Sequence, residues 1–319
     1  MPHTLHNKPE AIERVLIVDG VSRSGKKLLC QLLATLEHVE PFIYASIIEK
    51  LGYLAQLELL DADVAAKLAA LYGDELAYNR AVGRDLNTRR GDASSVLDSP
   101  RADELLARRE LAEGDAAIQR FNEASGVALL MTHALLPAMP PLLAAWPAPR
   151  VIHIARDPLH VACSWLERGW GERIGRDPRA FALTLRGPDG EALPWFAAPY
   201  AAEYAAMSAA ERCVRAVCDL TAASLDSLAT LRGDDRVMSL RFESLLRAPR
   251  PTMARAAAFV GSRADEAALE ALLARSALPA ELPDSSQREA AIATLERSVS
   301  ETTMIRLRAL CERYAAEAA

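Results

Sequence analysis

The sequence predicts an α/β fold in three layers, with a central parallel sheet flanked by helices and a helical C-terminal region. Short apolar runs rich in β-branched residues have the length of buried parallel strands. Segments with helical periodicity separate these runs, as in a sheet covered on both faces. A glycine-containing loop joins the first run to a helix. With 319 residues the chain can bury one large core, and we expect a single domain over residues 1–319.

The first half of the chain begins with a predicted strand at 15–20 (VLIVDG), which ends in glycine. A loop follows, and LLCQLLATLEHV at 28–39 is predicted to be helical. We expect amphipathic helices over 46–86 and 101–124, with a loop at 91–100 between them.

The second half contributes three more predicted strands and most of the remaining helices. The expected elements are strands at 127–133, 150–158 and 236–245, a helix after Pro158, an irregular segment at 170–210, a helix at 208–231 and helices within 251–319. Strand–helix alternation of this kind favours parallel connections.

The composition excludes several classes of protein. The net charge of −6 argues against a nucleic-acid-binding protein, which needs a basic face. We see no signal-peptide pattern and no apolar run long enough to span a membrane, so we expect a cytoplasmic protein without stable membrane insertion. The five cysteines have no metal-type spacing and are predicted to be reduced thiols. The oligomeric state is left open.

The loop at residues 20–28 matches the spacing of a P-loop. Gly20, Gly25 and Lys26 stand where that motif requires them, and backbone N–H groups of such a loop form a concave anion site at a helix N-terminus. Arg23 and Lys27 add positive charge. Lys27 occupies the position where nucleotide triphosphatases carry the Ser or Thr that binds Mg²⁺. The loop is therefore predicted to bind an anion without a metal.

A second anion site is predicted after the third strand, over residues 156–164. Arg156 ends that strand at the carboxyl edge of the sheet, where open α/β sheets bind ligands. Ser164 falls in the first turns of the next helix. An arginine with a hydroxyl at the start of a helix suits a terminal phosphate.

With these two motifs the chain resembles the sulfotransferase family over residues 15–262. That family binds 5′-phosphosulfate with a strand–[K/R]-S-G-T-T/S–helix loop and the 3′-phosphate with R-x-P-x-x-x-x-x-S. The resemblance implies the donor 3′-phosphoadenosine-5′-phosphosulfate, with adenosine 3′,5′-bisphosphate as product. The residues it implies for donor binding are Arg23, Ser24, Gly25, Lys26, Lys27, Leu28, Arg156 and Ser164, and also Phe242, which borders the adenosine in RFESLLRAP.

Two features depart from the family pattern. Lys26 and Lys27 replace the usual hydroxyl pair of the phosphosulfate loop. The R-K-G element that some members carry near the C-terminus is not visible, and Arg288 is a candidate substitute.

His133 is the first candidate for the catalytic base. It follows Thr132 in MTHALLP, which resembles the K-T-H…P stretch that supplies the family's catalytic histidine. A histidine there could take the proton of an acceptor hydroxyl. Other branches use a glutamate soon after the loop helix, so Glu40 and Glu49 remain alternatives. The resemblance further implies that Arg23 and Lys27 neutralise the leaving phosphate.

Residues 165–210 are the predicted acceptor cleft or lid, because they concentrate tryptophan and tyrosine among glycine and proline breaks. Packing of a small subdomain explains these aromatics equally well. The predicted acceptor is a small-molecule or glycan hydroxyl, with a glycan as first choice. A P-loop small-molecule kinase and a catalytically silent nucleotide-binding protein of the same fold remain alternative functions.

Overall fold

The computed structural model describes residues 3–146, 149–275 and 284–317. The chain divides into two compact units that alternate along the sequence. The first comprises Met1–Gly20, Gly25–Ile154 and Leu231–Ala280, and the second comprises Val21–Ser24, Ala155–Thr230 and Glu281–Ala319. The prediction of a single domain stays a prediction.

The first unit contains a five-stranded sheet with the strand order β2-β3-β1-β4-β7. The strands are β1 (Val15–Asp19), β2 (Ile43–Tyr44), β3 (Ala128–Met131), β4 (Pro149–Ala155) and β7 (Val237–Arg241). β1 runs parallel to both β3 and β4, and β2 runs parallel to β3. The predicted parallel sheet is confirmed.

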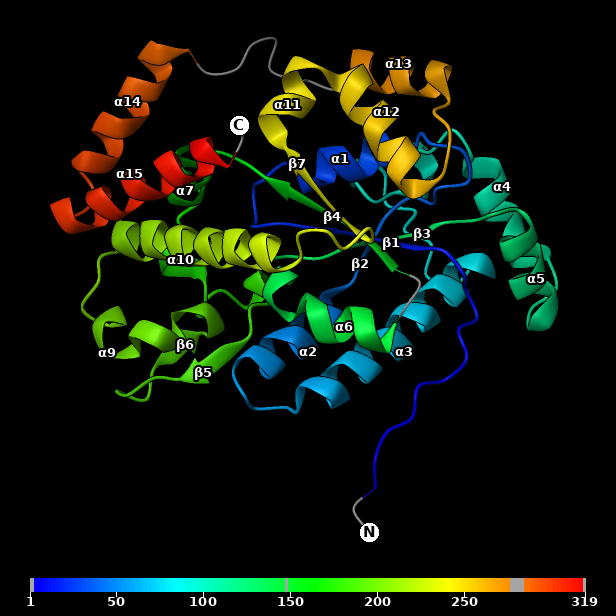
Figure 1. The fold of residues 1–319 in the computed structure, drawn as a ribbon, viewed down its shortest axis with the longest axis horizontal. Coiled ribbons are helices and arrows are strands. Elements are labelled where there is room, and N and C mark those ends of the chain that lie inside the picture. Colours follow the sequence, from blue (N-terminus) through cyan, green and yellow to red (C-terminus); the bar gives the residue numbers. More distant parts are fainter. Residues whose placement is uncertain (1–2, 147–148, 276–283, 318–319) are drawn as a thin grey trace. The chain divides into compact units, whose positions relative to one another are not determined.

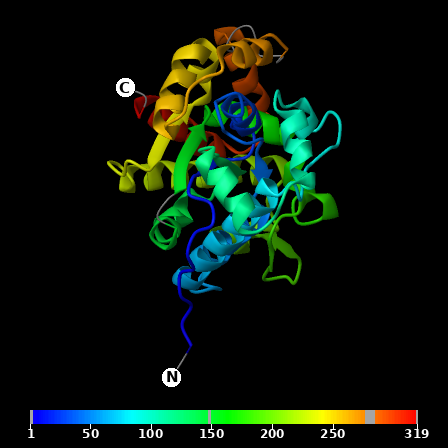
Figure 2. The same cartoon turned by 90° about the vertical axis from the view of Figure 1, so that its right-hand side faces the viewer.

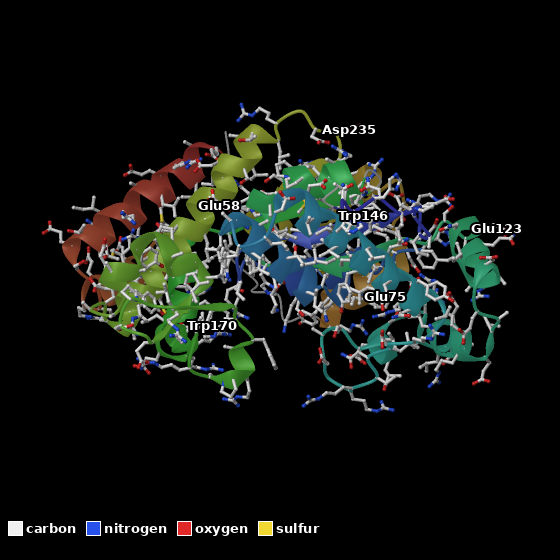
Figure 3. All side chains as sticks on the ribbon, turned by 90° about the horizontal axis from the view of Figure 1, so that it is seen from below. Glu58, Glu75, Glu123, Trp146, Trp170 and Asp235 are labelled. Atoms are coloured by element: carbon white, nitrogen blue, oxygen red, sulfur yellow. The ribbon has the colours of Figure 1, made fainter. Side chains whose placement is uncertain are left out.

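Helices cover both faces of this sheet, as Figures 1 and 2 show. Alternate strand residues such as Leu16, Val18 and Leu129 share one apolar cluster with residues of α1, α12 and α13. On the other face, the fully buried Trp146 packs over Gly73 of α3, where an added Cβ would lie 2.4 Å from the indole (Figure 3). The helices of the first unit are α1 (Lys26–Leu33), α2 (Ser46–Gln56), α3 (Ala62–Ala81), α4 (Ala102–Ala107), α5 (Asp115–Glu123), α6 (Met139–Ala145), α11 (Phe242–Arg247), α12 (Pro249–Val260) and α13 (Glu266–Arg275). The predicted three-layer α/β architecture is confirmed.

The two long predicted helices of the first unit are each broken. Residues 46–86 form α2 and α3, because Asp61 caps a new helix by accepting hydrogen bonds from the N–H groups of Asp63 and Val64. Residues 101–124 form α4 and α5, separated at Gly114, whose φ of 66° interrupts a helix.

The predicted fourth strand is too long. β7 ends at Arg241, and Phe242 begins α11 with its ring buried in the first unit's core. The two-residue strand β2 is not predicted at all, since two residues carry no periodic signal.

The second unit is built around α7 (Pro158–Glu167) and α10 (Ala209–Thr230), which share an apolar cluster with α14 (Ser285–Glu296) and α15 (Glu301–Ala316). The segment predicted to be irregular holds an antiparallel hairpin of β5 (Thr184–Arg186) and β6 (Ala192–Pro194). It also holds α8 (Trp170–Arg173) and α9 (Ala201–Tyr204). Short 3₁₀ helices in the two units are η1 (Val96–Asp98), η2 (Arg108–Glu110), η3 (Leu136–Ala138), η4 (Pro178–Ala180) and η5 (Trp195–Tyr200).

Aromatic residues of this second unit pack against one another. Trp165 makes edge contacts with Trp170 and Phe196 at centroid distances of 4.9 and 6.2 Å, and Figure 3 labels Trp170. At least part of the aromatic concentration therefore has a packing role. Among the described helices, none combines the length and apolar character that a membrane crossing requires.

Candidate active site

The loop between β1 and α1 has the backbone of an anion site. Gly25 precedes the helix with φ 97°, and Arg23, a residue with a side chain, adopts a φ of 77°. Left-handed backbone of this kind is strained in a non-glycine residue and concentrates at binding sites. Gly25 has a further constraint, because an added Cβ would lie 2.2 Å from the ring of Phe242. Phe242 therefore packs directly on the loop.

Ser24 lies in this loop with its side chain inside. The residue is only 1% exposed, and its hydroxyl oxygen has no hydrogen-bond partner among the described residues. A buried hydroxyl normally finds a partner because desolvation without one is costly. An oxygen of a bound phosphosulfate would supply it, so the loop fits the donor that the motif implies.

The two lysines that replace the family's hydroxyl pair point to different environments. Lys26 is 4% exposed, and its ammonium donates to the carbonyl of Gly20 at 2.5 Å. Lys27 is exposed, with its ammonium 5.8 Å from the centre of the Tyr44 ring. The ammonium of Lys26 is therefore bound inside the first unit, whereas the exposed ammonium of Lys27 can contact a ligand.

His133 sits on a turn that Asp19 holds in place. β1 and β3 are parallel neighbours, so Asp19 at the end of β1 lies beside the residues that follow β3. Its carboxylate accepts from the Thr132 hydroxyl at 2.8 Å and from the N–H groups of Leu135 and Leu136 at 3.0 and 3.1 Å. The turn that carries His133 is thereby fixed from both sides.

Asp19 is fully buried and ionised. Burial by itself would raise the pKa of Asp19, but hydrogen bonding and charge from His153, the charge of Lys26 and the Leu135 N–H together hold that pKa well below its usual range. His153 is 1% exposed, with Nδ1 3.4 Å from Asp19. His153 is therefore a core residue beside Asp19.

Glu49 and His133 form a close pair. The Nδ1 of His133 lies 2.7 Å from Oε1 of Glu49, which stands in the first turn of α2. The Tyr53 hydroxyl, one turn further along α2, donates to the His133 carbonyl. Because Glu49 occupies Nδ1, Nε2 is the nitrogen left to meet an acceptor hydroxyl. Two of the three candidate bases, His133 and Glu49, are therefore in direct contact with each other.

The protonation state of His133 suits a base. Burial and then the positive charge of Lys26 lower the pKa of His133, and Glu49 offsets part of this shift. An imidazole with a lowered pKa is neutral near pH 7, as a proton acceptor must be. Its side chain remains 33% exposed, so a substrate can reach it.

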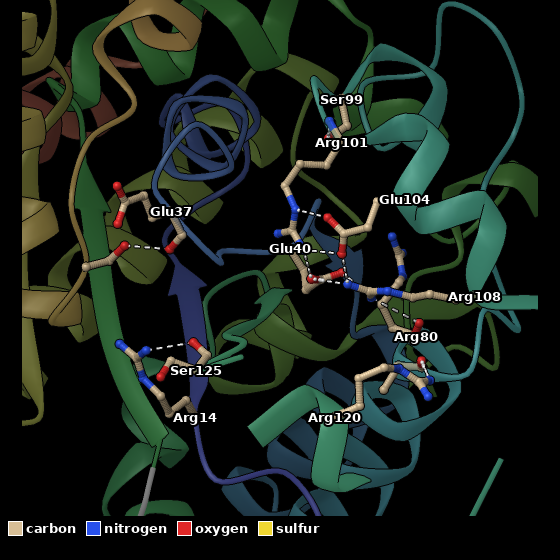
Figure 4. Close-up of polar contacts among 12 residues, drawn as sticks. Arg14, Glu37, Glu40, Arg80, Ser99, Arg101, Glu104, Arg108, Arg120 and Ser125 are labelled. Atoms are coloured by element: carbon tan, nitrogen blue, oxygen red, sulfur yellow. Dashed lines mark hydrogen bonds and ion pairs between the residues drawn. The ribbon is translucent and has the colours of Figure 1, made fainter. Parts of the chain in front are cut away.

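Glu40, the other glutamate candidate, has a different role. It is 1% exposed, and its carboxylate accepts two hydrogen bonds from Arg108 at 2.9 and 3.0 Å. Arg101 lies 3.3 Å away, and Figure 4 shows Glu40 enclosed by these arginines. Both oxygens of the Glu40 carboxylate are engaged by guanidinium groups, so neither is open to a substrate hydroxyl. The geometry therefore favours the His133–Glu49 pair over Glu40.

The second unit brings the two predicted anion motifs together. The Arg23 Nε donates to the Ser164 hydroxyl at 3.1 Å, and the Arg156 guanidinium donates to the Arg23 carbonyl at 3.2 Å. Arg168 also donates to the Ser164 hydroxyl, at 3.0 Å. We refer to Arg23, Arg156, Ser164 and Arg168 as the Ser164 cluster.

Arg168 is a member of this cluster that the motifs do not contain. The available sequence signal was its spacing, because residue i+4 on a helix lies beside residue i. Arg288, the candidate substitute for the missing R-K-G element, pairs with Asp157. Asp157 in turn caps α7 through the Leu159 N–H at 3.0 Å. Arg288 is thus bound to the residue that follows Arg156.

Comparison with protein-family models identifies the family of this chain. A family model described as "Sulfotransferase domain" matches residues 13–299. The chain therefore belongs to the sulfotransferase family and is a transferase. No curated protein matches the sequence.

Several solved structures are similar to this chain at low sequence identity. The sulfotransferase domain of the Synechococcus PCC 7002 olefin synthase is 15% identical with a TM-score of 0.47, and the match covers 98% of each chain. The sulfotransferase STF9 from Mycobacterium avium is 16% identical with a TM-score of 0.42, over 91% of this chain and 77% of that one. Retinol dehydratase, solved with androsterone and the inactive cofactor PAP, is 15% identical with a TM-score of 0.42, over 95% and 80%.

Proposed function

We propose that the protein transfers the sulfuryl group of 3′-phosphoadenosine-5′-phosphosulfate to an acceptor hydroxyl without a metal. The Ser164 cluster carries this proposal. Arg23 from the phosphosulfate motif and Ser164 from the 3′-phosphate motif are 141 positions apart in the sequence, yet they are hydrogen bonded. A donor with a phosphosulfate and a separate phosphate needs both motifs, whereas the phosphates of ATP form one continuous chain.

The roles of the residues follow from their charge and position. Nε2 of His133 takes the proton of the acceptor hydroxyl, whose oxygen attacks sulfur as the bond between sulfur and the 5′-phosphate oxygen breaks. The products are a sulfate ester and adenosine 3′,5′-bisphosphate. Arg23 and Lys27 neutralise the negative charge that develops on the leaving 5′-phosphate. The Ser24 hydroxyl and the loop N–H groups orient the phosphosulfate.

Lys26 has an indirect role in this scheme. Burial is the largest cause that lowers the pKa of His133, and the buried ammonium of Lys26 is the next, so both favour the neutral imidazole. The family's hydroxyl at this position carries no charge. In this chain the charge of Lys26 therefore influences the pKa of His133, the proposed base.

The proposed acceptor is a small-molecule or glycan hydroxyl, with residues 165–210 as its binding region. Arginine and acidic side chains beside aromatic rings suit the hydroxyl groups and faces of sugars.

The proposal is tested by transfer of radiolabelled sulfur from the donor to a panel of glycan and small-molecule acceptors. We expect a labelled ester with the wild-type protein and about 10²- to 10⁴-fold slower transfer with His133→Ala, the usual contribution of a general base. The same panel with labelled ATP and Mg²⁺ is the control. Phosphorylated product in that control, with no sulfated one, would establish a kinase instead.

A further inference from the structure

The hydroxyl of Ser164 accepts two hydrogen bonds from cations. Arg23 Nε donates to it at 3.1 Å and Arg168 Nη1 at 3.0 Å. A serine hydroxyl has two acceptor lone pairs and one O–H donor. Both lone pairs are therefore occupied, and only the donor remains. No hydrogen bond from this O–H occurs within the part of the chain that the structure describes.

Arg168 likewise has donors to spare. Its Nη1 also reaches the Ser164 carbonyl at 3.3 Å, while Glu167 lies at 4.0 Å, beyond hydrogen-bond range. Among its described contacts, Nε and Nη2 make no hydrogen bond. The side chain is 37% exposed, so these groups can reach a ligand.

The cluster gathers like charges. Burial lowers the pKa of Arg23, and Arg168 and then Arg156 lower it further. Anions bound beside these cations relieve repulsion of this kind. Arg23 is already assigned to the 5′-phosphate. The terminal phosphate monoester, with two negative charges and three terminal oxygens, is then matched by the guanidinium groups of Arg156 and Arg168 and the O–H donor of Ser164.

We propose that Arg168 is a binding residue for the donor's terminal 3′-phosphate and that it sets the selectivity for nucleotides that carry this phosphate. The proposal rests on the proposed function, since it concerns the same donor. It adds a second arginine to the Arg156 and Ser164 pair of the sequence motif. The hydrogen bond from Arg168 to Ser164 is a common contact between residues i and i+4 of a helix. An arginine with a solely structural role would not discriminate between nucleotides.

Calorimetric titration with adenosine 3′,5′-bisphosphate and with adenosine 5′-phosphate tests this selectivity. For Arg168→Ala we expect the Kd of the bisphosphate to rise about 10- to 100-fold, the effect of losing charge-assisted hydrogen bonds. The Kd of the 5′-phosphate should stay unchanged. Arg168→Lys keeps the charge without the planar fork and should fall between the two. Arg250→Ala is the matched control, because Arg250 of α12 is exposed and pairs only with Glu270 in the described structure.

The outcomes separate the two proposals. The role of Arg168 is overturned if Arg168→Ala binds the bisphosphate as tightly as wild type does, or if the Kd values of both nucleotides rise equally. The donor assignment stands in either case. An equal effect of Arg250→Ala would show that loss of any surface positive charge weakens binding, and it would overturn the specific role of Arg168. Wild-type protein that does not prefer the bisphosphate over the 5′-phosphate overturns both proposals. Circular dichroism of each variant verifies that the fold is retained.

Discussion

At the scale of single residues, the proposed role of His133 as the base depends on its neighbours. The imidazole must be neutral to accept a proton and must present one nitrogen to the acceptor. Burial and Lys26 favour the neutral form, while Glu49 fixes Nδ1. Glu49 is therefore a positioning residue in this account, and its negative charge makes the imidazole more basic than it would otherwise be.

Glu49→Gln should lower kcat about 10-fold and shift the acidic limb of its pH profile to lower pH. The Glu49 carboxylate raises the pKa of His133, so neutral glutamine lets that pKa fall further. A less basic imidazole stays unprotonated in more acidic solution but accepts a proton less readily. The measurement is kcat against pH for both proteins.

The control for this experiment is Glu58→Gln, because Glu58 is exposed just beyond the same helix (Figure 3). It should leave the profile unchanged. An acidic limb of Glu49→Gln at the wild-type position would show that the pair does not govern the reaction.

Lys27→Ala should reduce kcat more than it weakens donor binding. The exposed ammonium is proposed to stabilise charge that grows on the 5′-phosphate during transfer, and such an interaction is stronger in the transition state than in the ground state. We expect kcat to fall about 10²-fold, as for the loss of one oxyanion donor, with a smaller change in the Kd of the bisphosphate. Steady-state kinetics and titration give both values, and an unchanged kcat would remove Lys27 from the chemistry.

At the scale of elements, the carboxyl ends of β1 and β3 hold the turn that carries His133, the proposed base. The Asp19 carboxylate bonds the turn through one hydroxyl and two backbone N–H groups. Because it is buried, removing its charge leaves those donors without a full acceptor. The stability of this sheet edge and the position of His133 are thus linked.

Asp19→Asn should lower the free energy of unfolding by about 3 kcal/mol at pH 7, the usual cost of disrupting a buried charged network. The folded-state pKa of Asp19 lies below its unfolded value, so its contribution is present above about pH 4 and is lost as pH falls further. Urea unfolding at pH 7 and pH 3 measures this. The difference between variant and wild type should shrink at pH 3, and an equal difference at both values would contradict the assignment.

The elements also show what local sequence can predict. Strands 15–20, 127–133 and 150–158 were found because continuous apolar runs are a strong signal. The break between α2 and α3 was missed, although Asp61 is a good helix cap. Residues 242–245 were predicted to be part of a strand but begin α11, where Phe242 and Leu245 are buried. A short apolar run does not distinguish a buried strand from a buried helix.

At the scale of the whole molecule, each unit contains one part of the proposed chemistry. The first holds the lysines, Asp19 and the His133–Glu49 pair, and the second holds the Ser164 cluster. The spacing of the two motifs predicted Arg23, Arg156 and Ser164 as anion-binding residues, because each motif fixes the positions of its residues along the chain. The Glu49–His133 contact, the Arg108 partners of Glu40 and the role of Asp19 arise from tertiary packing between distant segments, for which one sequence carries no signal.

The measurement that tests the central claim most directly is a thermal-shift titration with adenosine 3′,5′-bisphosphate, beside ATP with and without Mg²⁺. A ligand that binds only the folded protein raises its Tm. We predict a rise with the bisphosphate that does not depend on Mg²⁺ and that Arg156→Ala abolishes. A rise only with ATP and Mg²⁺ would contradict the assignment and point to phosphoryl transfer.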